Sequence, residues 1–397
     1  MLLHSVPCAE VFFSAPSPFL HCVHRAKARP TEGTNDMAHT PPGWTEPETI
    51  TIRPEAILPL DVVDRYLRGR LPNTDGPLEV VQFAGGHANL TYLVRFGEHE
   101  YVLRRPPGGP VAPGAYDMAR EFRVLSALHP VFPPASRPYL FCEDTSVLGA
   151  PFFVVERRRG LVIHKEMPPE YLNRPDLSRR LSEAMVDTLV EFHAIEYKAV
   201  GLETLGKPDG FVERQVTNWG KRWERVKDAA PIPLMDELSR WLLARIPRSP
   251  APTLLHNDYK LDNMMVDPAD IARILALFDW DQCTLGDPLV DLGLLLNYWT
   301  EAGDSPGRKF IAQAPTTLPG FYTRAEVVQR YAQRSGRDVS AMAFYETFAL
   351  WKTATVCMQL FVLYKNGQLQ DERLADFAQR ATALAEAAHV VTLTATC

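Results

Sequence analysis

One short run of the sequence, H-N-D-Y-K-L-D-N at residues 256–263, places Asp258 five residues before Asn263. Two short strand patterns separated by the turn D-P-A-D follow within residues 264–278, and Asp279 comes directly after them. A hairpin folded from these strands brings Asn263 close to Asp279, so an amide oxygen and a carboxylate converge. Hard oxygen ligands of this kind suit a hydrated magnesium ion.

Asp258 is expected to lie across the same loop from Asn263. There it can orient a hydroxyl group and accept its proton while a metal ion neutralises phosphate charge, which is the division of labour that phosphoryl transfer requires. Each residue alone has a structural explanation, because Asp258 can cap a turn and Asp279 can end a strand. The hairpin between them favours the chemical interpretation of the pair.

The elements that must position these residues are expected to form two lobes. Short alternating apolar runs predict a small sheet with one helix between about residues 80 and 156. After about residue 160 apolar residues recur at helical spacing, and the hairpin is the exception in this half. The order predicts an α+β chain with a β-rich N-lobe at residues 50–157 and a mainly helical C-lobe at residues 158–397. A cleft between two such lobes is a common place for a ligand.

The predicted elements of each lobe can be stated by their ranges. In the N-lobe we expect strands at residues 80–83, 91–95, 101–105 and 152–155, and a helix that begins at Met118. In the C-lobe we expect helices at residues 177–195, 212–228, 235–246, 291–300, 325–335, 341–363 and 370–389. His193 ends the first of these helices and is interpreted as a packing histidine, not a metal ligand.

Composition excludes several function classes. The formal net charge of −6 comes without a basic face, which argues against a nucleic-acid partner. No apolar stretch approaches the roughly 18 to 20 residues that span a bilayer, so no membrane partner is expected. Six cysteines without a C-x-x-C pair favour isolated thiols in a reducing cytoplasm. Residues 1–49 are expected to be a disordered extension without a secretory signal, and the role of residues 1–36 stays open.

Three motifs together carry a resemblance to a known family. H-N-D-Y-K-L-D-N, F-D-W-D and G-D-P-L-V-D-L-G resemble those of the aminoglycoside phosphotransferase and choline kinase family, over a stretch from about Val80 to beyond Trp351. The resemblance implies a bilobal protein-kinase-like fold. It makes Asp258 the counterpart of the catalytic base, and Asn263 and Asp279 the counterparts of the magnesium ligands.

The same resemblance assigns supporting roles around the loop. His256 is expected to support the loop by hydrogen bonding and not to act as a general base. Asp287 and Asp291, in G-D-P-L-V-D, are expected to hold the metal loop and to start a helix.

The N-lobe should supply the nucleotide grip. Gly85, Gly86 and Asn89 lie between two expected strands, where exposed backbone N–H groups can approach phosphates, although a Gly-Gly pair also serves any tight hairpin. This fold usually presents a lysine on its third strand, whereas this chain offers Arg104, with Glu121 as its expected partner. Arginine can hold phosphate bidentately. The neighbouring Arg105 is interpreted as a solvated side chain.

The run F-V-V-E-R at residues 153–157 resembles the hinge between the lobes. Backbone groups near Val155 and Arg157 are expected to contact an adenine edge, which makes ATP the expected nucleotide. Backbone contacts do not separate adenine from guanine, so GTP stays open.

The acceptor should bind in the C-lobe. The run at residues 214–223, with Y-V-L-R-R-P-P-G-G, resembles the family branch associated with acyl-CoA dehydrogenases, which implies a hydroxylated acyl-CoA as the acceptor. Nearby basic residues could attract the phosphates of CoA. A core-facing stripe explains the two tryptophans of the run equally simply. The candidate substrate residues are Asp281, Trp219, Lys221, Arg222 and Trp223, with Arg225 and Lys227 beside them.

Other functions stay open. An antibiotic kinase should carry a dense acidic surface, and a choline-type kinase should carry an aromatic cage, to which Tyr298, Trp299 and Trp351 could contribute. The missing lysine keeps a nucleotide-binding or metabolite-binding protein without catalysis among the alternatives. A protein kinase is disfavoured because no D-F-G or A-P-E motif follows Phe278. The sequence leaves the identity of the acceptor and the oligomeric state open.

Overall fold

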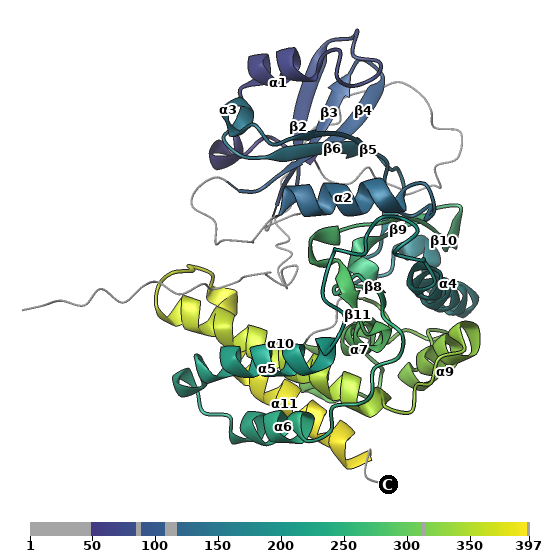
Figure 1. The fold of residues 1–397 in the computed structure, drawn as a ribbon, viewed down its shortest axis with the longest axis vertical. Helices are drawn as coiled ribbons and strands as arrows, with labels where there is room; N and C mark the ends of the chain where they lie inside the picture. Colours follow the sequence, from purple (N-terminus) through teal and green to yellow (C-terminus); the bar gives the residue numbers. More distant parts are fainter. Residues whose placement is uncertain (1–48, 85–88, 108–116, 311–313, 395–397) are drawn as a thin grey trace, which may run out of the picture. The chain divides into compact units, whose positions relative to one another are not determined.

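The computed structural model describes residues 49–84, 89–107, 117–310 and 314–394 (Figure 1). Its described residues divide into two compact units. The first takes in residues up to His129 and Ser136–Arg158, and the second takes in Pro130–Ala135 and Arg159 onward. The expected disordered extension lies, apart from Thr49, outside the described residues. The mixture of a sheet-bearing unit and a mainly helical unit confirms the predicted α+β class.

The first unit is built on an antiparallel sheet with the strand order β1-β2-β3-β4-β6-β5. Three helices accompany this sheet, and α2 packs along β5 and β6 (Figure 1). The strands are β1 (Thr49–Ile50), β2 (Leu78–Phe83), β3 (Leu90–Phe96), β4 (His99–Arg105), β5 (Pro138–Cys142) and β6 (Phe152–Glu156). The helices are α1 (Leu60–Leu67), α2 (Met118–Leu128) and α3 (Thr145–Leu148).

Side-chain alternation explains the core of this unit. Tyr92, Val94 and Phe96 lie two residues apart on β3 and are all buried, as the period of a strand requires. They pack with Leu103 of β4 and with Phe152 of β6 in one cluster. The four predicted strands are confirmed, whereas β1, β5, α1 and α3 were not predicted.

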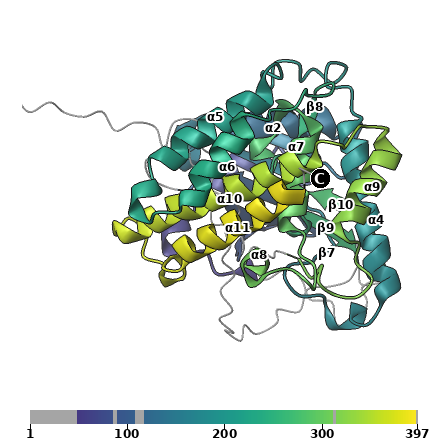
Figure 2. The same cartoon turned by 90° about the horizontal axis from the view of Figure 1, so that it is seen from below.

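The second unit is mostly helical, and its longest helix, α10, runs side by side with α11 (Figures 1 and 2). All seven predicted helices are present; the largest change is at α11, which begins at Phe377 because a 3-10 turn capped by Asp371 precedes it. The helices are α4 (Pro175–His193), α5 (Phe211–Glu224), α6 (Pro233–Leu243), α7 (Pro288–Tyr298), α8 (Pro306–Lys309), α9 (Arg324–Ser335), α10 (Met342–Lys365) and α11 (Phe377–Thr394).

Helix α7 lies at the centre of the second unit, and every one of its residues is buried. It packs against α10 so closely that a Cβ on Gly293 would lie 2.7 Å from the backbone oxygen of Tyr345. Helix α10 is itself long and apolar enough to cross a membrane by length and composition. However, 61% of its most apolar window is buried inside the protein, as in the core helix of a soluble protein.

Short strands complete the second unit and position the loop of interest. β9 (Met264–Asp267) and β10 (Asp270–Leu277) form the predicted hairpin, with β7 (Leu161–Val162) on the other side of β9. β8 (Thr253–Leu255) and β11 (Thr284–Gly286) pair with each other and flank the hairpin in sequence. The open end of the hairpin is closed by a hydrogen bond of 2.8 Å from the Phe278 N–H to the Asn263 carbonyl oxygen.

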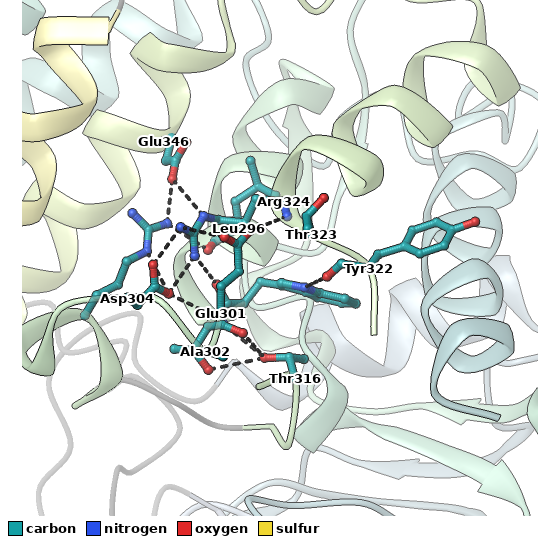
Figure 3. A network of polar contacts seen from close by, with 12 residues as sticks. Leu296, Glu301, Ala302, Asp304, Thr316, Tyr322, Thr323, Arg324 and Glu346 are labelled. Carbon is teal, nitrogen blue, oxygen red and sulfur yellow. Dashed lines mark hydrogen bonds and ion pairs between the residues drawn. The ribbon is translucent and has the colours of Figure 1, made fainter. Parts of the chain in front are cut away.

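A network of charged side chains fastens the segment that follows α7 (Figure 3). Arg324, at the start of α9, donates to both carboxylate oxygens of Asp304 at 2.7 Å. Arg308 of α8 donates to Glu346 of α10 and lies 3.8 Å from Asp304. The network therefore connects α8, α9 and α10 through Asp304, Arg308, Arg324 and Glu346.

Candidate functional site

The carboxylate of Asp258 is held from two sides. Lys260 donates from Nζ to both of its oxygens, at 3.0 and 2.9 Å. Asn263 donates from Nδ2 to the Oδ2 atom at 2.9 Å and to the backbone oxygen of Asp258 at 2.8 Å. All three side chains are buried, so the carboxylate has a fixed direction and a paired charge.

Lys260 was not predicted as a site residue, although its spacing of two residues from Asp258 is a signal in the sequence. Its backbone is extended, with φ −160° and ψ 164°. In an extended segment residues two apart face the same side, so a lysine two positions after Asp258 can return to its carboxylate. The Lys260 ammonium also lies 5.0 Å from the ring centroid of Tyr298.

His256 ties the loop to the residue before Asp279. The Asp258 N–H donates to His256 Nδ1 at 3.3 Å, so the ring proton is on Nε2, which donates to the Phe278 carbonyl oxygen at 2.9 Å. Burial lowers the pKa of His256, although nearby aspartates act in the opposite direction. The neutral ring thus bridges the two strand ends from which Asp258 and Asp279 project.

The first turn of α7 holds the backbone of the loop. Asp291 accepts the N–H of His256 at 2.6 Å and that of Asn257 at 2.7 Å, one on each carboxylate oxygen. Asp287 caps α7 by accepting the Leu289 N–H at 3.0 Å and also accepts the Tyr345 hydroxyl at 2.6 Å. These contacts agree with the supporting roles expected for both aspartates.

His193 contributes to the same support. Its Nε2 lies 3.3 Å from Asp291 and its Nδ1 lies 2.8 Å from the Tyr331 hydroxyl, and its side chain is buried. Within the described ranges no group of three or more histidine, cysteine, aspartate or glutamate side chains is arranged to hold a metal. His193 is therefore placed as a buried residue with polar contacts to Asp291 and Tyr331.

Asn263 and Asp279, the predicted magnesium ligands, lie at the open end of the hairpin. Because Nδ2 of Asn263 donates to Asp258, its Oδ1 is the atom left for a cation. Asp279 has a left-handed backbone with φ 67° and ψ 63°, which a residue with a side chain adopts at a cost of about 1 kcal/mol. Pairing of Phe278 with Asn263 places Asp279 one residue beyond that contact. An amide oxygen and a carboxylate fit the hard-ligand preference of Mg²⁺.

The arginine of the nucleotide grip has its expected partner. Arg104 on β4 forms an ion pair with Glu121 on α2, with 3.3 Å between the nearest nitrogen and oxygen. The prediction that Arg105 is a solvated side chain is wrong. Arg105 is 7% exposed and donates to the Leu148 carbonyl oxygen at 2.8 Å. The reason is the period of the strand, which places Arg105 on the buried face with Tyr101 and Leu103.

The predicted nucleotide grip also includes Gly85, Gly86, Asn89 and Val155. Gly85 and Gly86 lie outside the described residues. Asn89 is 3% exposed, and its side-chain amide has no hydrogen-bond partner among the residues that the structure describes. Val155 lies in β6 opposite Val102 of β4 and Pro138 of β5.

Arg157 follows the end of β6. Its guanidinium donates to the Arg158 carbonyl oxygen at 2.6 Å and lies over the Phe83 ring at 5.1 Å. These contacts belong to the sheet-bearing unit itself.

The acceptor candidates on α5 separate into core and accessible residues. Trp223 is 1% exposed and donates from Nε1 to Asp236 of α6 at 2.6 Å, so it is a core residue. Trp219 is also buried, but its ring carries the Arg222 guanidinium at 4.3 Å and the Lys352 ammonium at 5.4 Å. Lys221 is exposed.

The remaining acceptor candidates have simpler surroundings. Lys227 pairs with Glu224 at 2.7 Å, and Asp281 lies in the 3-10 turn Trp280–Gln282. Of the three residues considered for an aromatic cage, Trp351 is fully buried and donates to Met235. Trp299 is likewise buried and donates to the Tyr322 carbonyl oxygen. Core packing accounts for both tryptophans.

Lys352 was missed by sequence reasoning. The signal available was a lysine in the middle of the apolar helix at residues 342–365, where a charged side chain is unusual. Nothing in the sequence connects that helix to Trp219 of α5, and their contact depends on tertiary packing.

The chain is similar to a known enzyme family and to longer proteins of two animals. The family model for the phosphotransferase enzyme family matches residues 79–345. The chain is 31% identical over 345 residues to acyl-CoA dehydrogenase family member 10 of Mus musculus, covering 86% of this chain and 32% of that protein. It is 29% identical over 352 residues to acyl-CoA dehydrogenase family member 11 of Gallus gallus, covering 86% of this chain and 44% of that protein. The chain thus spans less than half the length of these relatives.

Solved structures give the same picture of the fold. A Ralstonia eutropha protein described as an aminoglycoside phosphotransferase matches with a TM-score of 0.74 and 29% identity, over 85% of this chain and 99% of that one. A choline/ethanolamine kinase family protein of Mesorhizobium loti matches with a TM-score of 0.54 and 16% identity, over 85% and 98% of the two chains. The second likeness concerns the fold alone.

Proposed function

This chain belongs to the phosphotransferase enzyme family, and on that premise we propose that it transfers the γ-phosphate of ATP to a hydroxyl group of a small molecule. The observation that carries the proposal is the Asp258 carboxylate, buried and fixed by Lys260 and Asn263. Fixed direction and paired charge are what a base needs to receive one particular hydroxyl proton.

The proposed reaction assigns each group one task. Asp258 orients the acceptor hydroxyl and takes its proton as the oxygen forms a bond to the γ-phosphorus. The bond between that phosphorus and the bridging oxygen breaks, and ADP leaves with the electron pair. Lys260 keeps the carboxylate in place next to the developing negative charge.

Asn263 and Asp279 would hold magnesium, which when bound neutralises phosphate charge. Their tasks depend on the hairpin and on the His256 bridge, which fix the distance between the two strand ends. In the sheet-bearing unit Arg104, braced by Glu121, is proposed to hold phosphates, together with Gly85, Gly86 and Asn89. Backbone groups near Val155 and Arg157 are proposed to bind adenine; guanine in the same place is the alternative that a nucleotide panel tests.

A hydroxyacyl-CoA is the acceptor that we propose to test first. The similarity to two acyl-CoA dehydrogenase family members supports this choice. The choice also has a physical basis, because two cations, Arg222 of α5 and Lys352 of α10, lie over the ring of the buried Trp219. Among the described residues, the buried cysteines Cys142, Cys283 and Cys357 fit the cytoplasm as the proposed location.

The test is nucleotide consumption and product formation with a panel of hydroxylated acceptors. Replacement of the base by its amide, Asp258→Asn, should lower kcat by about 10²–10⁴-fold, because general-base catalysis is worth that much. The matched control is Asp270→Asn, since Asp270 lies at the other end of the hairpin, where it accepts the Ala272 N–H and forms an ion pair with the exposed Arg180.

Two outcomes would count against the proposal. Equal turnover by Asp258→Asn and the parent would remove Asp258 as the base. Magnesium-dependent nucleotide binding without product from any acceptor would make the chain a nucleotide-binding protein without catalysis.

A further inference from the structure

Two cations share one aromatic ring in the helical unit. The Arg222 guanidinium of α5 and the Lys352 ammonium of α10 lie 4.3 and 5.4 Å from the ring centroid of Trp219. Cation–π contacts of this kind bring like charges toward one another. Arg225, one position beyond α5, adds a third positive charge that acts on Arg222.

Neither cation has a carboxylate partner among the described residues. Among those residues no hydrogen bond or ion pair involves the Arg222 guanidinium or the Lys352 ammonium, and both cations lie over the Trp219 ring. Burial lowers the pKa of both groups, and that of Lys352 falls to about 8. A partly buried charge without a carboxylate partner costs stability. The Trp219 ring and the charges of Asp258 and Asp291 offset only part of that cost for Lys352, because its pKa stays lowered.

The position of Lys352 relates this cluster to the proposed base. The charges of Asp258 and Asp291 both raise the pKa of Lys352, so its ammonium lies within electrostatic range of them. Asp258 does not need that charge, because Lys260 already donates to both of its oxygens. The Lys352 ammonium is therefore available to a ligand.

We propose that Arg222 and Lys352 bind an anionic group of the acceptor, a carboxylate or a phosphate, over the indole of Trp219, while its hydroxyl reaches Asp258. The inference rests on the proposed function and names its substrate class. A guanidinium can hold such an anion bidentately and an ammonium can add a point charge. A polycationic sugar or a quaternary amine meets like charge at the same place, which excludes it.

Binding without turnover gives the first test. The probes are CoA, which carries phosphates, 3-hydroxybutyrate, which carries a carboxylate, and the neutral N-acetylcysteamine thioester of 3-hydroxybutyrate. Calorimetry of the parent should show one anionic probe binding about 10-fold or more tightly than the neutral thioester, and which probe it is identifies the anion. Arg222→Gln and Lys352→Met should each weaken that binding about 10-fold, as expected for loss of a charged hydrogen bond.

Matched variants separate charge from packing. Arg245→Gln removes another arginine stacked on a tryptophan, at 5.0 Å from the Trp241 ring, and should leave binding unchanged. Lys352→Arg keeps the charge and should retain binding within a few-fold. If the parent binds no anionic probe more tightly than the neutral thioester, or if the Arg222 and Lys352 variants lose no affinity, the inference is wrong.

Steady-state kinetics gives the second test, with ATP and hydroxyacyl-CoA acceptors carrying the hydroxyl at carbon 3 or carbon 4. The Arg222 variant should raise the KM for the acceptor about 10-fold with the KM for ATP within about 3-fold of the parent. A rise confined to the KM for ATP would assign the two cations to the nucleotide and overturn the inference. Anion binding without turnover of any acceptor would instead refute the proposed function and leave the anion site standing.

Discussion

The Asp258 carboxylate and the Lys352 ammonium are two charged groups that differ in whether the protein gives them a partner of opposite charge. Asp258 is charged, buried and fully paired by Lys260 and Asn263. Lys352 is charged at neutral pH, half-buried over the Trp219 ring and without a hydrogen bond or ion pair among the described residues. A paired charge is compatible with stability, whereas an unpaired one lowers stability and is retained for a function.

This contrast predicts that Lys352→Met stabilises the protein. Burial lowers the pKa of Lys352 to about 8, against about 10.4 for an unfolded lysine. The unfolded chain therefore binds the proton more tightly, and the charged amine lowers the free energy of unfolding at pH 7, a penalty relieved as the pH rises from about 8 to 10.4. We expect the variant to gain about 1–3 kcal/mol at pH 7.

Urea unfolding at pH 7 and at pH 10 measures this effect. The advantage of the variant over the parent should shrink at pH 10, where the parent amine is largely neutral in the folded state. Lys365→Met, at the exposed end of the same helix, is the control and should change stability by less than about 0.5 kcal/mol. A loss of stability in Lys352→Met would mean that the amine has a structural partner.

At the scale of elements, the contact between α7 and α10 determines where the loop lies. The first turn of α7 carries Asp287 and Asp291, and the latter fixes the backbone of His256 and Asn257. Gly293 is the point of closest approach, because a Cβ there would meet the Tyr345 backbone at 2.7 Å. A shift of α7 is therefore transmitted to the proposed base.

Gly293→Ala should weaken both stability and catalysis. Backbone atoms of α10 cannot move aside as a flexible side chain can, so the added methyl forces the helices apart, at a cost of about 1–3 kcal/mol. We expect kcat to fall as well, since displacement of catalytic groups by a fraction of an ångström is costly. Urea unfolding and initial rates measure the two effects.

Gly303→Ala is the matched control, because a Cβ at Gly303 meets nothing within 4 Å. It should change neither the free energy of unfolding nor kcat appreciably. Parent-like values for Gly293→Ala would show that the two helices can separate without disturbing the loop.

Elements with strong local signals were predictable from the sequence, and the others were not. The hairpin follows from two apolar runs around D-P-A-D, and it places Asn263 and Asp279 at its open end. By contrast, β8 and β11 are three residues each and exist because they pair with each other across the hairpin. Such pairing is a property of the tertiary fold, and no local pattern encodes it.

The candidate site shows the same division. The Arg104–Glu121 ion pair could be predicted from strand position and helix spacing. Arg105 could have been placed on the buried face by strand alternation, but a charge there was taken as solvated. Lys352 could not be placed, because its neighbour Trp219 lies 133 positions away on another helix.

At the scale of the whole molecule, the charged network of the helical unit provides a contrast with the Trp219 cluster (Figure 3). Arg324 and Arg308 are partly or wholly buried, and each contacts Asp304 and Glu346. Removing one partner of such a network leaves the remaining charges uncompensated. We therefore expect the network to raise the free energy of unfolding most when its carboxylates are ionised.

This argument predicts a specific dependence of stability on pH. Burial raises the pKa of Asp304, but hydrogen bonds from Arg324 and from the Glu301 N–H outweigh it and leave the pKa below that of an ordinary aspartate. A depressed folded-state pKa contributes stability that is fully present above the unfolded pKa of about 3.9 and is lost as the pH falls through the folded value. Asp304→Asn should cost about 2–4 kcal/mol at pH 7.

Urea unfolding of the parent and of Asp304→Asn between pH 7 and pH 3 tests the prediction. The difference between their free energies of unfolding should be constant above about pH 5 and should narrow below about pH 4. Asp61→Asn is the control, because Asp61 is 76% exposed and its ion pair is with Arg65, one helical turn away. That variant should stay within about 0.5 kcal/mol of the parent at every pH. A gap for Asp304→Asn that persists unchanged to pH 3 would mean that the shape of the side chain, and not its ionisation, holds α8 and α9 in place.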